Sequence, residues 1–176
     1  RWYHEGIACF METWLGGGVG RALGGYDEMY FRSIIDGGEK LYSVVGLETE
    51  GSTMDFQVGA NAYLYGTRFV NYLTKTYGYE KMIQFYNRTA DSRTFFGKQF
   101  KKVYGQSLRK VWNDWKEDER KHQEENLATI RQYPITETKP LTKEPLGSVS
   151  PFVYDPATQK AYAVMNAPGD FAHMTE

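Results

Sequence analysis

The sequence is short of cysteine, of long apolar runs and of any excess of charge. A single cysteine in 176 residues, Cys9, excludes an internal disulfide framework and any zinc site built from several cysteines. No apolar run approaches the roughly 18 residues of a membrane-spanning helix, so we expect no membrane span. The 21 basic residues nearly balance the 22 acidic ones, giving a formal net charge of −1. Without a global basic field, we expect no nucleic-acid partner.

The residues needed for a folded core are present. Hydrophobic residues make up 41% of the chain and charged residues 24%, which excludes gross disorder at this length. The aromatic share is 16%, with 14 tyrosines, which suits broad amphipathic surfaces as well as a core. The chain opens at Arg1 with neither an initiator Met nor a signal-peptide pattern. We therefore expect a piece of a longer protein.

Apolar spacing and helix-breaking residues predict a mainly α-helical subdomain over residues 1–135. The predicted helices lie at about residues 2–15, 26–35, 56–77, 80–88, 95–104 and 107–131. Residues 39–53 fit either a short helix or a connector. The last helix is strongly charged from Lys116 to Glu125, and its mixed signs favour a solvated face over a binding patch.

The character of the chain changes after Tyr133. Five of the six prolines lie between residues 134 and 156, and proline is a poor residue for a helix interior. We predict an extended linker at 136–149 and a β-hairpin within 150–176, with its two strands around 152–154 and 161–164. Because an isolated hairpin is marginal in water, we expect residues 150–165 to pack on the helices or to pair with another copy of the chain.

Two carboxylates stand among apolar residues in the first predicted helix. Glu5 and Glu12 are two helical turns apart, so they project from one face. Carboxylates on a helix-packing face are costly unless they are paired or bind a metal. From the residues alone, either solvated or ion-paired glutamates or a metal site would account for them.

The segment Trp2-x-x-Glu5-Gly6-x-Ala8-x-x-x-Glu12 resembles the W-x-x-E-G-x-A-x-x-x-E segment of gluzincin metallopeptidases, the superfamily that includes the zinc aminopeptidases. There, an H-E-x-x-H helix supplies two zinc-binding histidines and the general base, and a second helix supplies the third ligand. The resemblance implies that Glu5 binds zinc and that Glu12 orients a histidine ligand. It also implies hydrolysis of a peptide or protein substrate by a metal-activated water.

Two further segments resemble the same superfamily and follow in the expected order. Tyr63-Leu64-Tyr65-Gly66 resembles its Y-x-x-G helix, which implies that Tyr63 donates a hydrogen bond to the oxyanion of the tetrahedral intermediate. The other interpretation of Tyr63 is one more core tyrosine. The stretch from Phe100 to Trp115 resembles the helical close of such domains and bears only on the fold.

The sequence departs from the superfamily because it contains no H-E-x-x-H motif. We expect that motif upstream of Arg1. Because zinc sites use three or four protein ligands, we expect this chain alone to bind no catalytic zinc and to be inactive on peptides. We also expect the face around Glu5 to be uncovered and to drive self-association. The apolar residues expected to be exposed there are Trp2, Ile7, Phe10 or Trp14.

Other conspicuous residues have ordinary structural interpretations. The glycine-rich stretch at 16–25 lacks the G-K-[ST] of a phosphate loop and is expected to be an interhelical loop. Cys9 has no acid or base neighbour in sequence and is expected to be a small buried residue. His4 either lines the active-site cleft that the metallopeptidase resemblance implies or is a partly exposed structural histidine.

The C-terminal segment resembles the opening blade of TolB-like β-propellers. The resemblance rests on Ser150-Pro151-x-x-x-Asp155-Pro156, followed by Ala161-Tyr162-Ala163. It implies a propeller after the helical subdomain and an exported parent protein. The sequence thus favours a fragment of a zinc-dependent metallopeptidase. The alternative is a non-catalytic helical scaffold or interaction module with an aromatic binding groove.

Overall fold

The computed structural model describes residues 1–48, 59–92, 96–139, 143, 148–166, 171 and 173–175. This part of the chain is mainly α-helical with a small β-sheet at the C-terminal end, which confirms the predicted fold class. The α-helices are α1 (Trp2–Leu15), α2 (Gly25–Asp36), α3 (Val44–Glu48), α4 (Ala60–Tyr77), α5 (Tyr79–Tyr86), α6 (Phe96–Tyr104) and α7 (Leu108–Ile130). Short 3₁₀ turns are η1 (Arg21–Leu23) and η3 (Ala90–Ser92).

The helix boundaries agree closely with the sequence pattern. The first helix has the bounds that the apolar spacing predicts, and the long last helix begins after Ser107, whose side chain accepts a hydrogen bond from the backbone N–H of Lys110. α3 occupies part of the stretch at 39–53 that fitted a helix or a connector. The predicted beginning of the third helix at 56–58 lies outside the described residues, as does Phe95.

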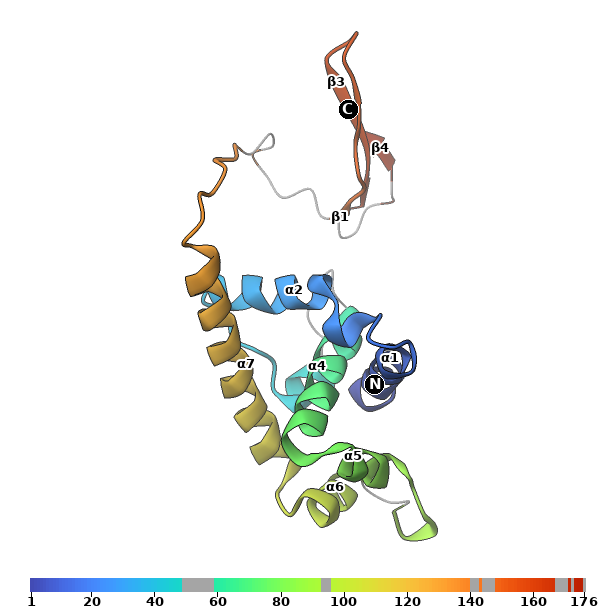
Figure 1. Ribbon diagram of the computed structural model, residues 1–176. Coiled ribbons are helices and arrows are strands. Elements are labelled where there is room, and N and C mark those ends of the chain that lie inside the picture. Colours follow the sequence, from blue (N-terminus) through green and yellow to red (C-terminus); the bar gives the residue numbers. More distant parts are fainter. Residues whose placement is uncertain are drawn as a thin grey trace.

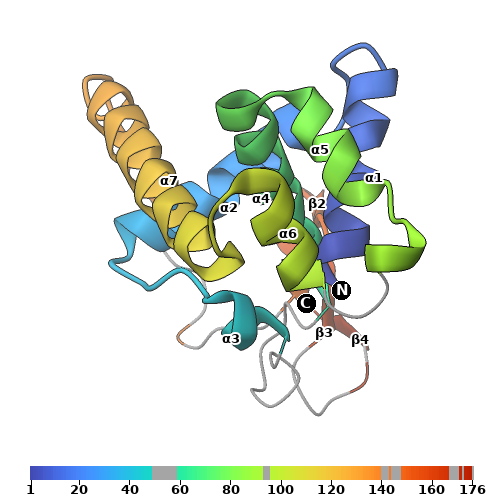
Figure 2. The same ribbon diagram turned by 90° about the horizontal axis from the view of Figure 1, so that it is seen from below.

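Helix α4 is the centre of the helical part. Figures 1 and 2 show it between α7 on one side and α1 on the other. Its buried side chains meet a cluster of aromatic rings from α1 and α7, in which the ring centroid of Phe69 lies 4.6 Å from that of Trp112 and 5.5 Å from that of Trp2. Burial of these large rings is the main source of stability for the helical part.

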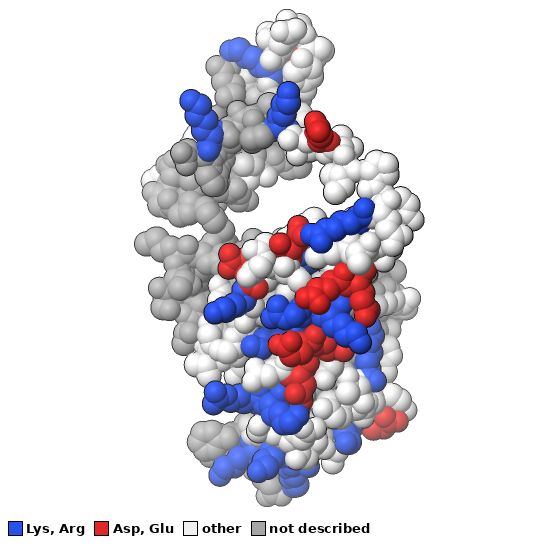
Figure 3. Space-filling view, turned by 90° about the vertical axis from the view of Figure 1, so that its left-hand side faces the viewer, with Lys and Arg blue, Asp and Glu red and all other residues white. Residues whose placement is uncertain are grey.

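The charged half of α7, from Lys116 to Glu125, was predicted to be a solvated face. The structure agrees with this prediction only in part. Figure 3 shows basic and acidic side chains mixed over the face on which α7 lies. Within that half, however, Glu119 and Gln123 are buried. The reason is a largely covered arginine on α4, Arg68, whose side chain is only 11% exposed and needs an acidic partner from α7.

The C-terminal sheet is built around β3 (Lys160–Asn166). It pairs antiparallel with β1 (Ser148–Val149), β2 (Val153–Asp155) and β4 (His173–Thr175). The hairpin predicted from the sequence is the β2–β3 pair. Its turn is fixed by Asp155, which accepts hydrogen bonds from the backbone N–H of Ala157 and the hydroxyl of Thr158.

The sheet differs from the prediction in two respects. β1 lies in the last residues of the segment predicted as linker, because β3 is longer than the sequence pattern suggested and offers Met165 and Asn166 as partners. The strands also lie apart from the helices rather than packing on them (Figure 1). Pairing with another copy of the chain stays a prediction. None of the helices in the described segments is long and apolar enough to cross a membrane.

Candidate functional site

A close crossing of α1 and α4 brings together two residues that lie far apart in the sequence, Glu5 and Tyr63. At this crossing Gly6 faces Gly66. A Cβ atom on Gly66 would stand 2.5 Å from the carbonyl oxygen of Trp2, and one on Gly6 would overlap the backbone of Gly66. No other residue fits at either position. The glycines of the E-G and Y-x-x-G segments therefore have a physical role, since they let the two helix backbones touch.

The Glu5 carboxylate lies beside the Tyr63 side chain at this crossing. Tyr63 is 36% exposed, whereas Tyr65 is fully buried. The interpretation of Tyr63 as a core tyrosine is therefore wrong. The nearby Glu5 carboxylate raises the pKa of Tyr63. At neutral pH its hydroxyl is thus a neutral hydrogen-bond donor beside a half-buried carboxylate.

Glu12 lies on the same open face of α1 as Glu5, as their spacing predicts. Between and beyond them Ala8 and Leu15 are also exposed, and together these four residues form what we call the α1 stripe. The stripe is open to solvent along the length of the helix. Glu12 is an exposed carboxylate.

The apolar residues expected beside the stripe are mostly covered, which corrects that prediction. Trp2 is completely buried because Phe69 and Trp112 pack on its ring. Phe10 is buried against Val70 and Met82. Ile7 is half-buried, and only Trp14, at 43%, is substantially exposed. The rings of Trp2 and Phe10 point toward α4 and not toward the open face.

Arg21 and Asp27 extend the site on the other side of Tyr63. The guanidinium carbon of Arg21 lies 5.7 Å from the centre of the Tyr63 ring. Its Nε and Nη2 atoms donate to Oδ1 of Asp27 over 3.2 and 3.1 Å. Asp27 is buried, and burial raises its pKa although the hydrogen bond and charge of Arg21 act to lower it. No local pattern in the sequence points to this pair, because an acid in the first turn of a helix is accounted for by the helix dipole.

The remaining residues singled out from the sequence have structural roles. Cys9 is free and buried, as predicted, and burial raises the pKa of its thiol. The glycine-rich stretch is the interhelical loop between α1 and α2 that the sequence predicts, and it contains η1. His4 is exposed and lies edge-on to the ring of Tyr3.

The donor groups at the site are fewer than a zinc site needs. Across the described residues there is no group of three or more His, Cys, Asp or Glu side chains placed to hold a metal ion. The carboxylate of Glu5 lies on an open face and can supply one metal ligand. Zinc in proteins takes three or four such ligands, so these residues cannot hold it by themselves.

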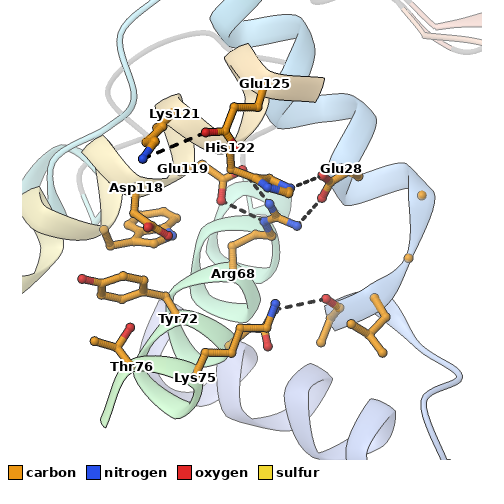
Figure 4. Close-up of a pocket in the computed structure, with 16 residues that line it drawn as sticks. Glu28, Arg68, Tyr72, Lys75, Thr76, Asp118, Glu119, Lys121, His122 and Glu125 are labelled. Atoms are coloured by element: carbon orange, nitrogen blue, oxygen red, sulfur yellow. Dashed lines mark hydrogen bonds and ion pairs between the residues drawn. The ribbon is translucent and has the colours of Figure 1, made fainter. Parts of the chain in front are cut away.

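A second polar cluster, which the sequence did not predict, lies among α2, α4 and α7. It centres on Arg68, which donates from Nε and Nη2 to Glu119 over 3.1 and 2.6 Å and from Nη1 to Glu28 (Figure 4). Glu28 also faces His122, with 2.6 Å between Nε2 and Oε1, and accepts from Asn126 over 2.9 Å. These residues border an open cavity of about 630 Å³. The cluster joins three helices through paired charges.

Comparison with family models, curated proteins and solved structures finds no match for this chain. The functional conclusion therefore rests on the chain's own residues and their geometry.

Proposed function

We propose that the helical part of this protein carries the carboxylate and tyrosine half of a gluzincin-type zinc metallopeptidase centre. The observation that supports this proposal is the contact of α1 with α4 at Gly6 and Gly66, which places Glu5 beside Tyr63. In the superfamily that the sequence resembles, the matching positions are the third zinc ligand and the oxyanion-binding tyrosine. The zinc held by Glu5 and the hydroxyl of Tyr63 would act on the same substrate carbonyl, so the proposal requires the two residues to be adjacent.

Each residue has a defined role in this proposal. Glu5 is one zinc ligand, and the two histidine ligands come from outside these 176 residues. Zinc, when bound, supplies the Lewis acid that activates water. Tyr63 keeps its proton at neutral pH and donates a hydrogen bond to the carbonyl oxygen as that oxygen gains negative charge. Glu12, exposed two turns along the α1 stripe, accepts a hydrogen bond from a histidine ligand.

The test uses the natural gene product that contains this chain. We expect the wild type to hold zinc and to hydrolyse peptides of a mixed-sequence library. E5Q removes a zinc ligand and should lose both properties. Y63F leaves the ligands intact, so it should keep zinc but lower kcat by roughly 10²–10³-fold, the usual cost of losing one oxyanion donor.

The chain offers a matched control for both substitutions. Tyr79 and Glu80 are an exposed tyrosine–glutamate pair at the beginning of α5, in which the glutamate likewise raises the pKa of the tyrosine. E80Q and Y79F should leave zinc content and hydrolysis unchanged. Zinc and activity that survive in E5Q, or a wild-type gene product without either, would contradict the proposal.

A second candidate function, an interaction module, is favoured by a separate apolar groove. Its volume is about 440 Å³, and its lining includes Phe10, Trp14, Leu23 and Tyr79. Three of these side chains are exposed, which is unusual for residues of this size. If the protein is such a module, it should bind apolar peptides without zinc, and W14A with L23S should abolish that binding while E5Q leaves it intact.

A further inference from the structure

We infer that Arg21, anchored by Asp27, is a positioning residue that holds the ring of Tyr63 in place beside Glu5. The inference rests on the proposed role of Tyr63 as the oxyanion-binding residue. Nothing in the sequence resemblance points to Arg21, and three sets of contacts in the structure do.

The first set of contacts fixes the backbone that carries Arg21. Gly20, the residue before it, has φ +151°, and a Cβ atom there would overlap the side chain of Thr13. The Thr13 hydroxyl donates to the carbonyl of Cys9 over 3.1 Å and accepts from the N–H of Ala22 over 3.1 Å. The loop is thereby tied to α1, the same helix that carries Glu5.

The second set fixes the guanidinium itself. Arg21 is partly exposed, and such side chains are usually mobile, but two of its nitrogen atoms bind one oxygen of buried Asp27. The other oxygen of Asp27 has no hydrogen-bond partner. A buried carboxylate with one unpaired oxygen costs free energy, and folded proteins tolerate such costs mainly at sites where a group must be held in place. Here the group that is held is Arg21.

The third set joins Arg21 to Tyr63. Its guanidinium carbon lies 5.7 Å from the ring centre, a distance at which a cation is attracted to an aromatic ring. The ring is thus held by a cation at its face. The charge of Arg21 also lowers the pKa of Tyr63, against the larger effect of Glu5, so the two charges act on the phenol in opposite directions.

Tyr79 provides an internal comparison. A neighbouring glutamate, Glu80, raises its pKa in the same way, but in the described part of the chain no arginine or lysine lies over its ring. If Arg21 positions Tyr63, then the ring of Tyr63 should be more ordered than that of Tyr79 in the same molecule.

The experiment measures tyrosine ring order by ¹³C relaxation in the 176-residue chain at neutral pH, with selectively labelled tyrosine. In the wild type we expect a higher ring order parameter for Tyr63 than for Tyr79. R21Q should lower the value for Tyr63 to that of Tyr79 and leave Tyr79 unchanged. R21K, which keeps the cation but loses the planar two-nitrogen contact, should restore part of the order. R109Q, at an exposed arginine of α7, should change neither ring.

D27N tests whether the effect passes through Arg21. Releasing Arg21 from its anchor should lower the order of the Tyr63 ring as R21Q does, provided that the circular dichroism spectrum remains that of the wild type. Amide chemical shifts of Ala22 and Gly24 report whether the loop itself has moved. If R21Q disorders the loop and leaves Tyr63 ordered, Arg21 only closes the loop and the inference is overturned.

Equal order of the two rings in the wild type would also overturn it. These measurements need neither zinc nor hydrolysis. An inactive gene product would refute the proposed function while leaving the Arg21 result intact, and the reverse also holds.

Discussion

At the scale of single residues, Gly66 is a position with almost no room for change, because a Cβ there would stand 2.5 Å from the carbonyl oxygen of Trp2. In contrast, Gly97 on α6 has nothing within 4 Å of the place where a Cβ would stand. We expect G66A to lower the free energy of unfolding by about 1–3 kcal/mol, because the helices must separate to admit a methyl group. G97A is the matched control and should raise it by up to about 1 kcal/mol, since alanine favours a helix.

Urea denaturation of both variants tests this prediction. It would be contradicted if G66A were as stable as G97A. The effect of Glu5 on the pKa of Tyr63 should weaken in G66A alone, because only that substitution moves α1 away from α4.

The position of a single residue could be predicted only where its spacing from nearby residues in the sequence was informative. Glu5, Glu12 and the Gly16–Gly25 loop could be placed because their spacing is local in the sequence. The burial of Trp2 and Phe10 could not be predicted, because the apolar face of α1 is wide and the sequence does not show which part of it packs against the core. In the structure, side chains from other helices cover both residues.

At the scale of the elements, the contact between α2 and α7 depends on Glu28. Burial acts against ionisation of this carboxyl, but the charge of Arg68 and the hydrogen bond from His122 outweigh it and lower its pKa. An acid whose pKa is lowered in the folded state stabilises that state above its ordinary pKa. The contribution of Glu28 is therefore complete above pH 4.5 and is lost as the pH falls from 4.5 through the lowered pKa.

We expect E28Q to lower the free energy of unfolding at pH 7 by about 1–3 kcal/mol, because charge-assisted hydrogen bonds to Arg68 are lost. The difference from the wild type should shrink below pH 4.5, since a protonated glutamate resembles glutamine. E125Q removes an exposed ion pair with Lys121 and should cost less than about 0.5 kcal/mol at any pH. Urea titrations at pH 7 and pH 3.5 would refute the prediction if the E28Q difference did not change.

The helices were predictable and the cluster around Arg68 was not, for one physical reason. Helices α1, α4 and α7 are specified by periodic apolar residues within one stretch of chain. The cluster takes one charged residue from each of three helices, namely Glu28, Arg68 and Glu119. Within its own stretch of sequence, each of them has the pattern of an ordinary surface charge. Likewise β1 and β4 are too short to have a pattern of their own, and they exist through pairing with β3.

At the scale of the whole molecule, exposed apolar side chains occur on two separate parts. Leu15 on the α1 stripe is 79% exposed, and Phe152 beside β2 is 69% exposed. Surfaces of this kind favour association. We expect the 176-residue chain to self-associate through the α1 stripe, and sedimentation velocity over a range of concentrations measures this.

L15K should raise the dissociation constant at least about tenfold, which corresponds to about 1.4 kcal/mol. F152K, at the sheet, is the control and should leave the dissociation constant unchanged. The opposite ranking of the two variants would place the interface on the sheet, and a monomer at every concentration would refute self-association.

The contact of Gly6 with Gly66 has a further consequence for how the protein tolerates change. Because main chain meets main chain there, the separation of the two helix axes is set by atoms that every amino acid shares. Substitutions among the aromatic rings deeper in the molecule alter side-chain volumes, yet they leave this spacing as it is. The sequence of the core can therefore drift while Glu5 and Tyr63 stay within reach of each other, so long as both glycines persist.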